Sequence, residues 1–269
     1  MSLIILSTRP DIYSTRRILE ESTKLGFNSE VVDYRTCSLG IGNISRVLHQ
    51  GRDLNPKVII PRIGSKSSQF GAAVVRQFTG MGVMTTTQPG AILRARDKFA
   101  TVQALALAGV PVPATSIARS PSGINEVLEL VNGAPVVVKL LEGTHGSGVV
   151  LAETKKAAES LITAFHQLDA DMCVQEFIKE AKGEDIRAFV VNGRVVASMK
   201  RKAAPGDFRA NLHMGGEAEE VELSDDEIRY ALSAARTVGL DIAGVDMLRT
   251  DRGPLVLEVN VSPGLQGIE

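Results

Sequence analysis

The sequence predicts a mixed α/β and α+β protein whose N-terminal part is a doubly wound parallel sheet. In residues 1–90, short apolar runs alternate with amphipathic stretches of helical length, which is typical of parallel strands covered by helices. In residues 185–260, two pairs of apolar runs are each separated by a short turn containing glycine, which indicates antiparallel hairpins.

The composition is that of an ordinary globular protein, with 44% hydrophobic and 23% charged residues. A net charge of −1 provides no electrostatic footprint for nucleic acid, so we expect no direct nucleic-acid binding. No stretch approaches the roughly 20 apolar residues of a membrane span, and residues 1–10 lack a basic leader. Cys37 and Cys173 are isolated and lack metal-ligand spacing, so we expect a cytoplasmic protein with reduced thiols.

The N-terminal elements follow one another as strand, helix and strand. The apolar run at residues 3–6 predicts the first strand, and an amphipathic helix over residues 13–25 ends at Gly26. The next predicted elements are strands at 31–32, 57–61 and 83–86 and a helix at 71–78. No glycine follows the first strand, so this layer lacks the turn of a dinucleotide site. Residues 62–65 end a strand where open sheets usually bind ligands, but the sequence favours a plain surface turn there.

Residues 91–108 predict one long helix, which contains the charged run 94–98 and ends before Gly109. We place the first domain boundary at this helix and divide the chain into residues 1–94, 95–178 and 179–269. The middle part is predicted to contain helices at 124–131 and 155–168 and strands at 135–141, 149–151 and 172–178.

A glycine-rich segment, residues 142–148, joins two of these strands. Because it joins strand to strand, it is neither a Walker loop nor a dinucleotide fingerprint, both of which open a helix. It could lay backbone N–H groups over phosphates, or it could be a plain flexible hairpin. Lys139 in the apolar strand beside it favours phosphate binding, because a buried lysine without an anionic partner is costly.

A hairpin with an Asn-Gly turn at residues 192–193 is the strongest local signal, because this pair favours a type I′ turn. Regular pairing across the turn places Arg187 opposite Ser198 and Asp185 opposite Lys200. The basic, aperiodic segment 201–216 that follows predicts a mobile loop that closes over substrate, or else a solvated basic loop. A capping box at 224–227 then begins a helix that ends at Gly239.

The last hairpin has the clearest chemical signal. With a three-residue loop at 251–253, Asp246 lies opposite Glu258, and side-chain alternation puts Asn260 on the same face. Two carboxylates with β-carbons roughly 5 Å apart repel each other, and a divalent cation would relieve that repulsion. Carboxylates, an amide oxygen and substrate phosphates suit Mg²⁺. The alternative is that the acids reach the rim of the sheet or pair with an arginine.

In this order, the features resemble the ATP-grasp enzymes, which clasp Mg-ATP between two α+β lobes, and in particular the RimK family of glutamate ligases. The resemblance runs nearly end to end and implies an ATP-grasp fold with an N-terminal pre-ATP-grasp domain. Its most specific stretches are residues 94–98, 133–148, 174–181, 206–213 and 244–269.

The resemblance implies nucleotide-binding roles at matching positions. The candidates for holding the ATP phosphates are Lys98, Lys139, Gly143, Gly146 and Gly148. The candidates for the interlobe strand that reads adenine are Gln175, Glu176, Phe177 and Ile178. The remaining nucleotide contacts are Asp185, with Arg209, Ala210 and Asn211 closing over the nucleotide.

It also implies metal and catalytic roles. Asp246, Glu258 and Asn260, which the hairpin register selects independently, would bind two Mg²⁺ or Mn²⁺ ions. Arg187 and Arg201 are our candidates for contacting the transferring phosphoryl group and the acyl-phosphate.

The implied reaction is an ATP-dependent ligation. The γ-phosphoryl group passes to the terminal carboxylate of an acceptor, and the amine of L-glutamate displaces phosphate from the acyl-phosphate. The enzyme supplies position, positive charge and exclusion of water. The implied acceptor is a protein or peptide with a C-terminal carboxylate, such as a small-subunit ribosomal protein or a poly-glutamate chain, and the enzyme is expected to be a homo-oligomer with no membrane partner.

Two alternatives remain open. A kinase would use the glycine loop and the paired acids, but the sequence has no His-Arg-Asp catalytic loop and no Asp-Phe-Gly. A non-catalytic nucleotide-sensing module would not need the full set of phosphate and metal residues.

Overall fold

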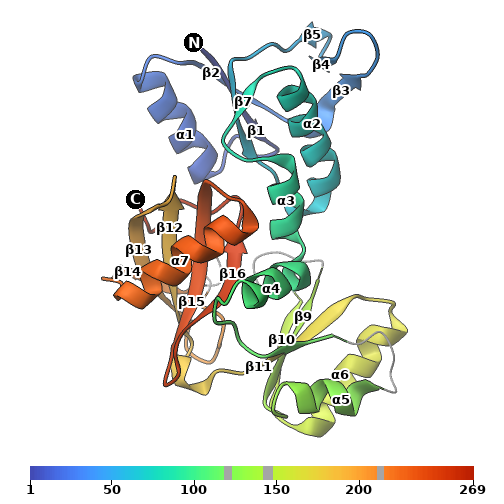
Figure 1. Cartoon of the computed structure of the whole chain (residues 1–269), viewed down its shortest axis with the longest axis vertical. Helices are drawn as coiled ribbons and strands as arrows, with labels where there is room; N and C mark the ends of the chain where they lie inside the picture. Colours follow the sequence, from blue (N-terminus) through green and yellow to red (C-terminus); the bar gives the residue numbers. More distant parts are fainter. Residues whose placement is uncertain (118–122, 142–147, 211–214) are drawn as a thin grey trace.

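The computed structural model describes residues 1–117, 123–141, 148–210 and 215–269 (Figure 1). In these ranges the strands form four sheets. Figure 1 shows the N-terminal sheet at the top, the five-stranded C-terminal sheet with its helix α7 below it, and the central lobe at the lower right. No helix in the described ranges combines the length and apolar character needed to cross a membrane.

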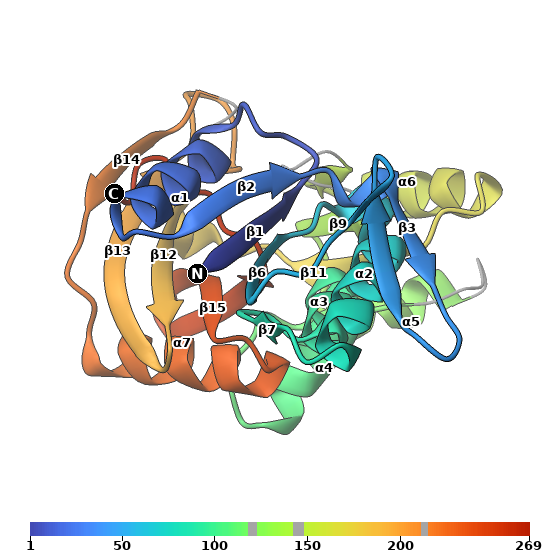
Figure 2. The same ribbon diagram turned by 90° about the horizontal axis from the view of Figure 1, so that it is seen from above.

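The N-terminal sheet is parallel, with strand order β2-β1-β6-β7. Its strands are β1 (Ser2–Ser7), β2 (Asn28–Val32), β6 (Val58–Arg62) and β7 (Met84–Thr85). Helices α1 (Tyr13–Lys24) and α2 (Ser68–Gly80) lie on opposite faces of the sheet (Figures 1 and 2). The prediction of a doubly wound N-terminal layer is therefore confirmed.

A small antiparallel sheet between β2 and β6 was not predicted. Its strands are β3 (Cys37–Gly40), β4 (Arg46–His49) and β5 (Arg52–Asp53), and a 3-10 turn, Tyr34–Thr36, precedes them. The strands are too short to show a hydrophobic period. Tyr34 is fully buried, and its hydroxyl accepts a hydrogen bond from the Gly64 backbone N–H, so this segment braces the end of β6.

The predicted single helix over residues 91–108 is wrong, because the chain bends at Asp97. Two helices, α3 (Pro89–Arg96) and α4 (Lys98–Leu107), meet there. Asp97 has an extended backbone, and its side chain accepts a hydrogen bond from the Ala100 backbone N–H. Asp97 is therefore the N-cap of α4, and a capped helix start outweighs continuous helical propensity at this position.

The central lobe has its own sheet and its own core. The antiparallel strands, in the order β10-β9-β11-β8, are β8 (Thr115–Ser116), β9 (Val136–Leu140), β10 (Val149–Ala152) and β11 (Met172–Glu176). Helices α5 (Ile124–Leu130) and α6 (Lys155–Gln167) pack on it. A second, larger core joins the N-terminal sheet to the C-terminal lobe through α3 and α4.

The C-terminal lobe is a five-stranded antiparallel sheet in the order β14-β13-β12-β15-β16. Its strands are β12 (Glu184–Val191), β13 (Arg194–Lys202), β14 (Glu217–Glu220), β15 (Ile242–Thr250) and β16 (Gly253–Asn260), and a 3-10 turn, Lys179–Ala181, precedes them. Helix α7 (Asp225–Val238) packs on the sheet, and both hydrogen bonds of its predicted capping box are present. Gly239 ends it with a φ of 81°, as expected.

A β-bulge shifts the register of the first hairpin. The Asn-Gly turn is present, with positive φ at both residues, but Val196 has no partner on β12 in the described pairing. Asp185 therefore lies opposite Arg201 rather than Lys200, and Arg187 lies opposite Met199 rather than Ser198. A bulge puts two residues opposite one, so the extra residue in β13 shifts the pairing by one residue from the predicted register.

A second bulge lies in the last hairpin. Its loop contains two residues, 251–252, rather than the three predicted, since Thr250 pairs with Gly253. Leu257 is the extra residue on β16, and beyond it Asp246 pairs with Glu258. The predicted three-residue loop is therefore wrong. The predicted pairing of Asp246 with Glu258 is confirmed, because the extra residue in the bulge compensates for a loop that is one residue shorter.

The packing of α2 on the end of β6 yields a stability prediction. A Cβ at Gly71 would overlap the Cγ2 of Ile63 and lie 3.1 Å from its Cδ1, and Ile63 is 1% exposed. Gly71→Ala should lower the free energy of unfolding by about 1–3 kcal/mol, the usual cost of overpacking. Gly80→Ala in the same helix has no atom within 4 Å and is the matched control. Urea unfolding measures both, and equal effects of the two substitutions would contradict this packing.

Candidate active site

The predicted metal residues meet on one face of the C-terminal sheet. Asp246 lies within β15 and is 2% exposed. It is opposite Glu258 on β16 and opposite Arg187 on β12. The amide nitrogen of Asn260 donates to Asp246 Oδ2 at 3.2 Å and to Glu258 Oε1 at 3.0 Å. The amide thus bridges two carboxylates that would otherwise repel each other.

Two arginines neutralise the buried carboxylates. Arg187 forms a bidentate ion pair with Asp246, with N–O distances of 2.6 and 2.7 Å. Arg201 forms the same arrangement with Asp185, at 2.6 and 2.7 Å, and its Nη2 also lies 2.9 Å from Asp246 Oδ2. Charges therefore alternate along Asp185, Arg201, Asp246 and Arg187. This is the arginine pairing that the sequence left open as the alternative to a metal.

The network separates the proton affinities of its two aspartates. Burial opposes ionisation of Asp246, but Arg187 and Arg201 outweigh it and hold the pKa of Asp246 below its usual range. Burial, followed by repulsion from Asp246, raises the pKa of Asp185. Asp185 is therefore the carboxylate that would take up a proton first.

The donor set fits a divalent cation held partly by substrate. In the described part of the chain, no three His, Cys, Asp or Glu side chains are grouped to hold a metal ion. Asp246, Glu258 and Asn260 offer two carboxylates and one amide, which is the partial set that Mg²⁺ uses together with phosphates. Asn260 would have to present its oxygen in place of the nitrogen that now faces the acids.

Two partly buried lysines lie within electrostatic range of Glu258. Lys139 Nζ donates to Gln175 Oε1 at 2.6 Å, and Lys98 Nζ donates to the Leu140 carbonyl at 2.9 Å. Burial lowers the pKa of both lysines, and the charge of Glu258 opposes that shift in each. The charge of Glu258, a predicted metal ligand, therefore acts on both predicted phosphate-binding lysines.

The predicted adenine-reading residues lie where β11 leaves the central lobe. The strand ends at Glu176 rather than at residue 178 as expected. Gln175 is 3% exposed and donates to the Thr115 hydroxyl at 2.9 Å. Glu176 accepts from the Ala114 backbone N–H at 2.9 Å and from Arg252 at 2.8 Å. Sequence reasoning missed these three partners, which come from segments remote in the chain.

The connection after Glu176 is held by an aromatic pair. The rings of Phe177 and Phe208 meet edge to face with centroids 6.1 Å apart, and Ile178 is buried. Phe208 belongs to the segment after β13, so this contact ties that segment to the connection between the lobes.

The predicted basic loop 201–216 is only partly a loop, because Arg201 and Lys202 belong to β13. Arg201 is 7% exposed and its guanidinium is bound within the sheet, so it is not available as a loop cation. Arg209 forms an ion pair with Asp207 at 2.8 Å, and Ala210 is buried. Asn211 lies outside the described residues.

The glycine segment is described only at its end. Gly143 and Gly146 lie outside the described residues, and Gly148 has a φ of +80°. A Cβ at Gly148 would lie 2.8 Å from Leu140 Cδ1, so glycine is required there by the fold of the hairpin.

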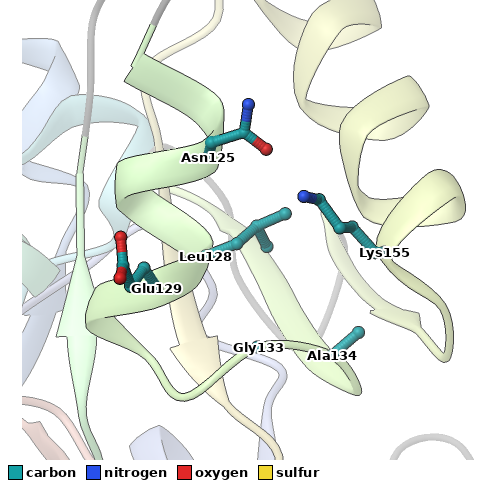
Figure 3. A pocket seen from close by; sticks show the side chains of 6 residues that line it. All are labelled: Asn125, Leu128, Glu129, Gly133, Ala134 and Lys155. Carbon is teal, nitrogen blue, oxygen red and sulfur yellow. The ribbon is translucent and has the colours of Figure 1, made fainter.

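A shallow pocket lies apart from these residues, between α5 and the start of α6 (Figure 3). Its lining residues are Asn125, Leu128, Glu129, Gly133, Ala134 and Lys155. Figure 3 shows Lys155 reaching from α6 toward α5, and the lining includes no predicted site residue. We assign this pocket no role in the chemistry of the site.

Two family models match the chain. A model described as a RimK PreATP-grasp domain matches residues 1–92, and one described as a RimK-like ATP-grasp domain matches residues 95–269. A relative from Marinobacter nauticus named probable alpha-L-glutamate ligase is 51% identical over 271 residues, covering 100% of this chain and 90% of the relative. A Hahella chejuensis relative, probable alpha-L-glutamate ligase 1, is also 51% identical over 271 residues, covering 100% and 89%.

A solved structure shares the fold. The ATP-grasp ligase PsnB, in complex with a phosphomimetic variant of a minimal precursor, Mg and ADP, superposes with a TM-score of 0.74 and 21% identity. The match covers 100% of this chain and 92% of that chain. This likeness shows that the fold is the ATP-grasp fold that the sequence predicted.

The ion-pair network yields a prediction that needs no activity assay. Arg201→Met would leave Asp185 and Asp246 buried with fewer cationic partners, which typically costs 3–5 kcal/mol, so we expect a loss of about that size. Arg46→Met is the control, because Arg46 and Asp53 form an exposed pair with side chains 54% and 45% exposed. It should cost about 0–1 kcal/mol. Urea unfolding compares the two variants, and similar losses would rule out a structural role for the buried network.

Proposed function

This chain belongs to the RimK-like ATP-grasp family, and we propose that it is an ATP-dependent ligase that adds L-glutamate to a C-terminal carboxylate of a protein or peptide. The observation that supports this most is that the charge of Glu258, in the last hairpin, acts on both Lys98 and Lys139. Cations that would bind phosphate and acids that would bind a metal ion are thus within electrostatic range of one another, as phosphoryl transfer needs.

The proposed nucleotide site lies between the central and C-terminal lobes. Lys98 and Lys139 neutralise the ATP phosphates, together with the segment containing Gly143, Gly146 and Gly148. The adenine contacts are Gln175, Glu176, Phe177 and Ile178. Asp185 would contact the nucleotide, and Arg209, Ala210 and Asn211 would close over it. To bind a phosphate, Arg209 would exchange its ion pair with Asp207.

Asp246, Glu258 and Asn260 would hold two Mg²⁺ or Mn²⁺ ions, which when bound neutralise charge on the phosphates. Arg187 and Arg201 have different capacities for the transferring group. Arg201 is bound to two carboxylates, whereas Arg187 is bound to one, Asp246, among the described residues. Arg187 therefore retains more N–H groups for a phosphoryl oxygen, and Arg201 serves chiefly to position the carboxylates.

The reaction has two steps. An oxygen of the acceptor's terminal carboxylate attacks the γ-phosphorus of ATP, and the bond to the β-phosphate oxygen breaks to release ADP. The amine of glutamate then attacks the acyl-phosphate carbon, phosphate leaves with the C–O bonding pair, and the amine gives up a proton. The protein contributes position, positive charge and exclusion of water from the acyl-phosphate.

The proposed acceptor is supported only by the names of similar proteins and by the molecules bound in their structures. Relatives at about half identity are named probable alpha-L-glutamate ligases, and a structure of PsnB contains a precursor peptide. We propose a protein or peptide acceptor, with a small-subunit ribosomal protein or a poly-glutamate chain as candidates, and a homo-oligomeric enzyme. No observation favours a kinase or a nucleotide sensor.

One assay tests the proposal. Phosphate release from ATP should require both glutamate and an acceptor peptide, and mass spectrometry should find the acceptor longer by glutamate residues. A stable phosphorylated acceptor would point to a kinase, and ATP binding without turnover would point to a sensor. Either result would contradict the ligase proposal.

The phosphate role of Lys139 is tested by Lys139→Ala. Losing a charge-assisted contact of roughly 1.5–3 kcal/mol should raise the ATP KM or lower kcat by about 10–100-fold. The glutamate KM should change little. Lys155→Ala is the control, because Lys155 lies on α6 of the same lobe with its side chain 64% exposed. An unchanged ATP response in Lys139→Ala would remove Lys139 from the site.

The metal role of Glu258 is tested by Glu258→Gln. We expect kcat to fall by about a hundredfold or more, the scale of losing one electrostatic group from an active site. The melting temperature should change little, because relief of the repulsion between Glu258 and Asp246 offsets the lost attraction to Lys98 and Lys139. Glu220→Gln on the exposed strand β14 is the control. Near-normal Mg²⁺-dependent turnover in Glu258→Gln would contradict the assignment.

A further inference from the structure

Two arginines lie together at the carboxyl end of the N-terminal sheet. Arg62 is the last residue of β6 and Arg96 is the last residue of α3. The Nη2 of Arg96 donates to the carbonyl of Ile63, the residue after Arg62. Figure 1 shows α3 running from the N-terminal sheet toward α4 and β16. Open α/β sheets bind ligands at this edge.

Among the residues that the structure describes, neither guanidinium has the anionic partner that its burial calls for. In the same ranges the Nε atoms of Arg62 and Arg96 are both buried without a hydrogen-bond partner. The side chain of Arg62 forms neither a hydrogen bond nor an ion pair with any described residue. Glu258 attracts Arg96 electrostatically, but no ion pair between them occurs among the described residues. By contrast, other guanidiniums are each paired with a carboxylate, namely those of Arg187, Arg201, Arg209 and Arg252.

The electrostatic cost of this arrangement is large. Burial, and then repulsion from Arg96, lowers the pKa of Arg62 to about 10, and burial lowers the pKa of Arg96. Both side chains still carry their charge at neutral pH. Two partly desolvated cations beside each other are unfavourable unless an anion joins them.

These arginines continue a row of cations. Arg96 repels Lys98, and Lys98 repels Lys139, so the row runs from Arg62 to Lys139 with Glu258 acting on the last three members. The bend at Asp97 separates Arg96, the last residue of α3, from Lys98, the first residue of α4. The lysine end, with Lys98 on α4 and Lys139 on β9, belongs to the proposed nucleotide site. At the other end, Arg62 lies in the N-terminal sheet and Arg96 at the end of α3.

We propose that Arg62 and Arg96 form a second anion site, which binds a substrate carboxylate that does not react. The inference rests on the proposed function, in which the substrates carry more carboxylates than the reaction uses. Glutamate reacts through its amine and keeps both carboxylates, and an acceptor ending in glutamate keeps its side-chain carboxylate. A guanidinium binds a carboxylate through two parallel N–H groups, and this fork matches the unpartnered Nε atoms.

Kinetics distinguish the two sources of the carboxylate. In Arg62→Gln and Arg96→Gln, the KM of either free glutamate or the acceptor peptide should rise roughly tenfold or more, while the ATP KM stays within about twofold. A rise for glutamate assigns the site to the incoming amino acid, and a rise for the peptide assigns it to the acceptor. Arg76→Gln on the exposed side of α2 is the control and should change none of these values. Unchanged KM values for both substrates would overturn the inference.

A binding measurement separates this inference from the ligase proposal. Millimolar glutarate, a dicarboxylate without an amine, should raise the melting temperature of the wild type and of Arg76→Gln but not of Arg62→Gln. Without ligand, Arg62→Met should melt at a higher temperature than the wild type, because an uncompensated charge is removed. Should ligation be absent from the wild type, a glutarate shift that depends on Arg62 would still support the anion site. No glutarate shift in the wild type would overturn it, whatever the outcome for ligation.

Discussion

A carboxylate buried within a five-stranded sheet is the constraint on which the candidate site depends. Asp246 is 2% exposed, and an ionised group there is tolerable only because Arg187 and Arg201 contact both of its oxygens. Strand register places each partner. Arg187 lies directly across from Asp246, and the bulge in β13 places Arg201 opposite Asp185. A shift of one residue would turn these side chains to the other face of the sheet.

The rest of the charge pattern follows from that arrangement. With Asp246 paired with arginines, Glu258 is the acid whose charge acts on both Lys98 and Lys139. Burial raises the free-energy cost of keeping these lysines charged. Their positive charge is therefore not balanced by the nearby acids. A polyphosphate ligand would supply the missing negative charge.

Local signals in the sequence were sufficient for much of the fold. The Asn-Gly turn, the capping box at Ser224 and the alternation that pairs Asp246 with Glu258 each depend on a few neighbouring residues. The bulges could not be foreseen, because a bulge is chosen by packing on both faces of a sheet. The bend at Asp97 was hidden by helix-forming residues on both sides.

The misses at the site have a common cause. Sequence reasoning assigned Arg201 to a loop because basic residues without period suggest solvent, whereas its partners lie on strands 16 and 45 positions away. The signal in Arg62 was weaker still, since only the structure shows that its Nε is buried without a partner. Ion pairs between residues far apart in the sequence produce no periodic sequence pattern from which they could be predicted.

The central lobe has a hydrophobic core separate from the one that joins the two other parts of the molecule. Cooperative opening follows contiguous cores, so backbone amides of β9 and β11 should exchange with solvent hydrogen through a subglobal event that leaves the C-terminal sheet closed. Because Lys139 and Gln175 belong to that smaller unit and Asp246 to the larger one, the two halves of the candidate site have different local stabilities. A ligand that contacts both would couple them into one cooperative unit.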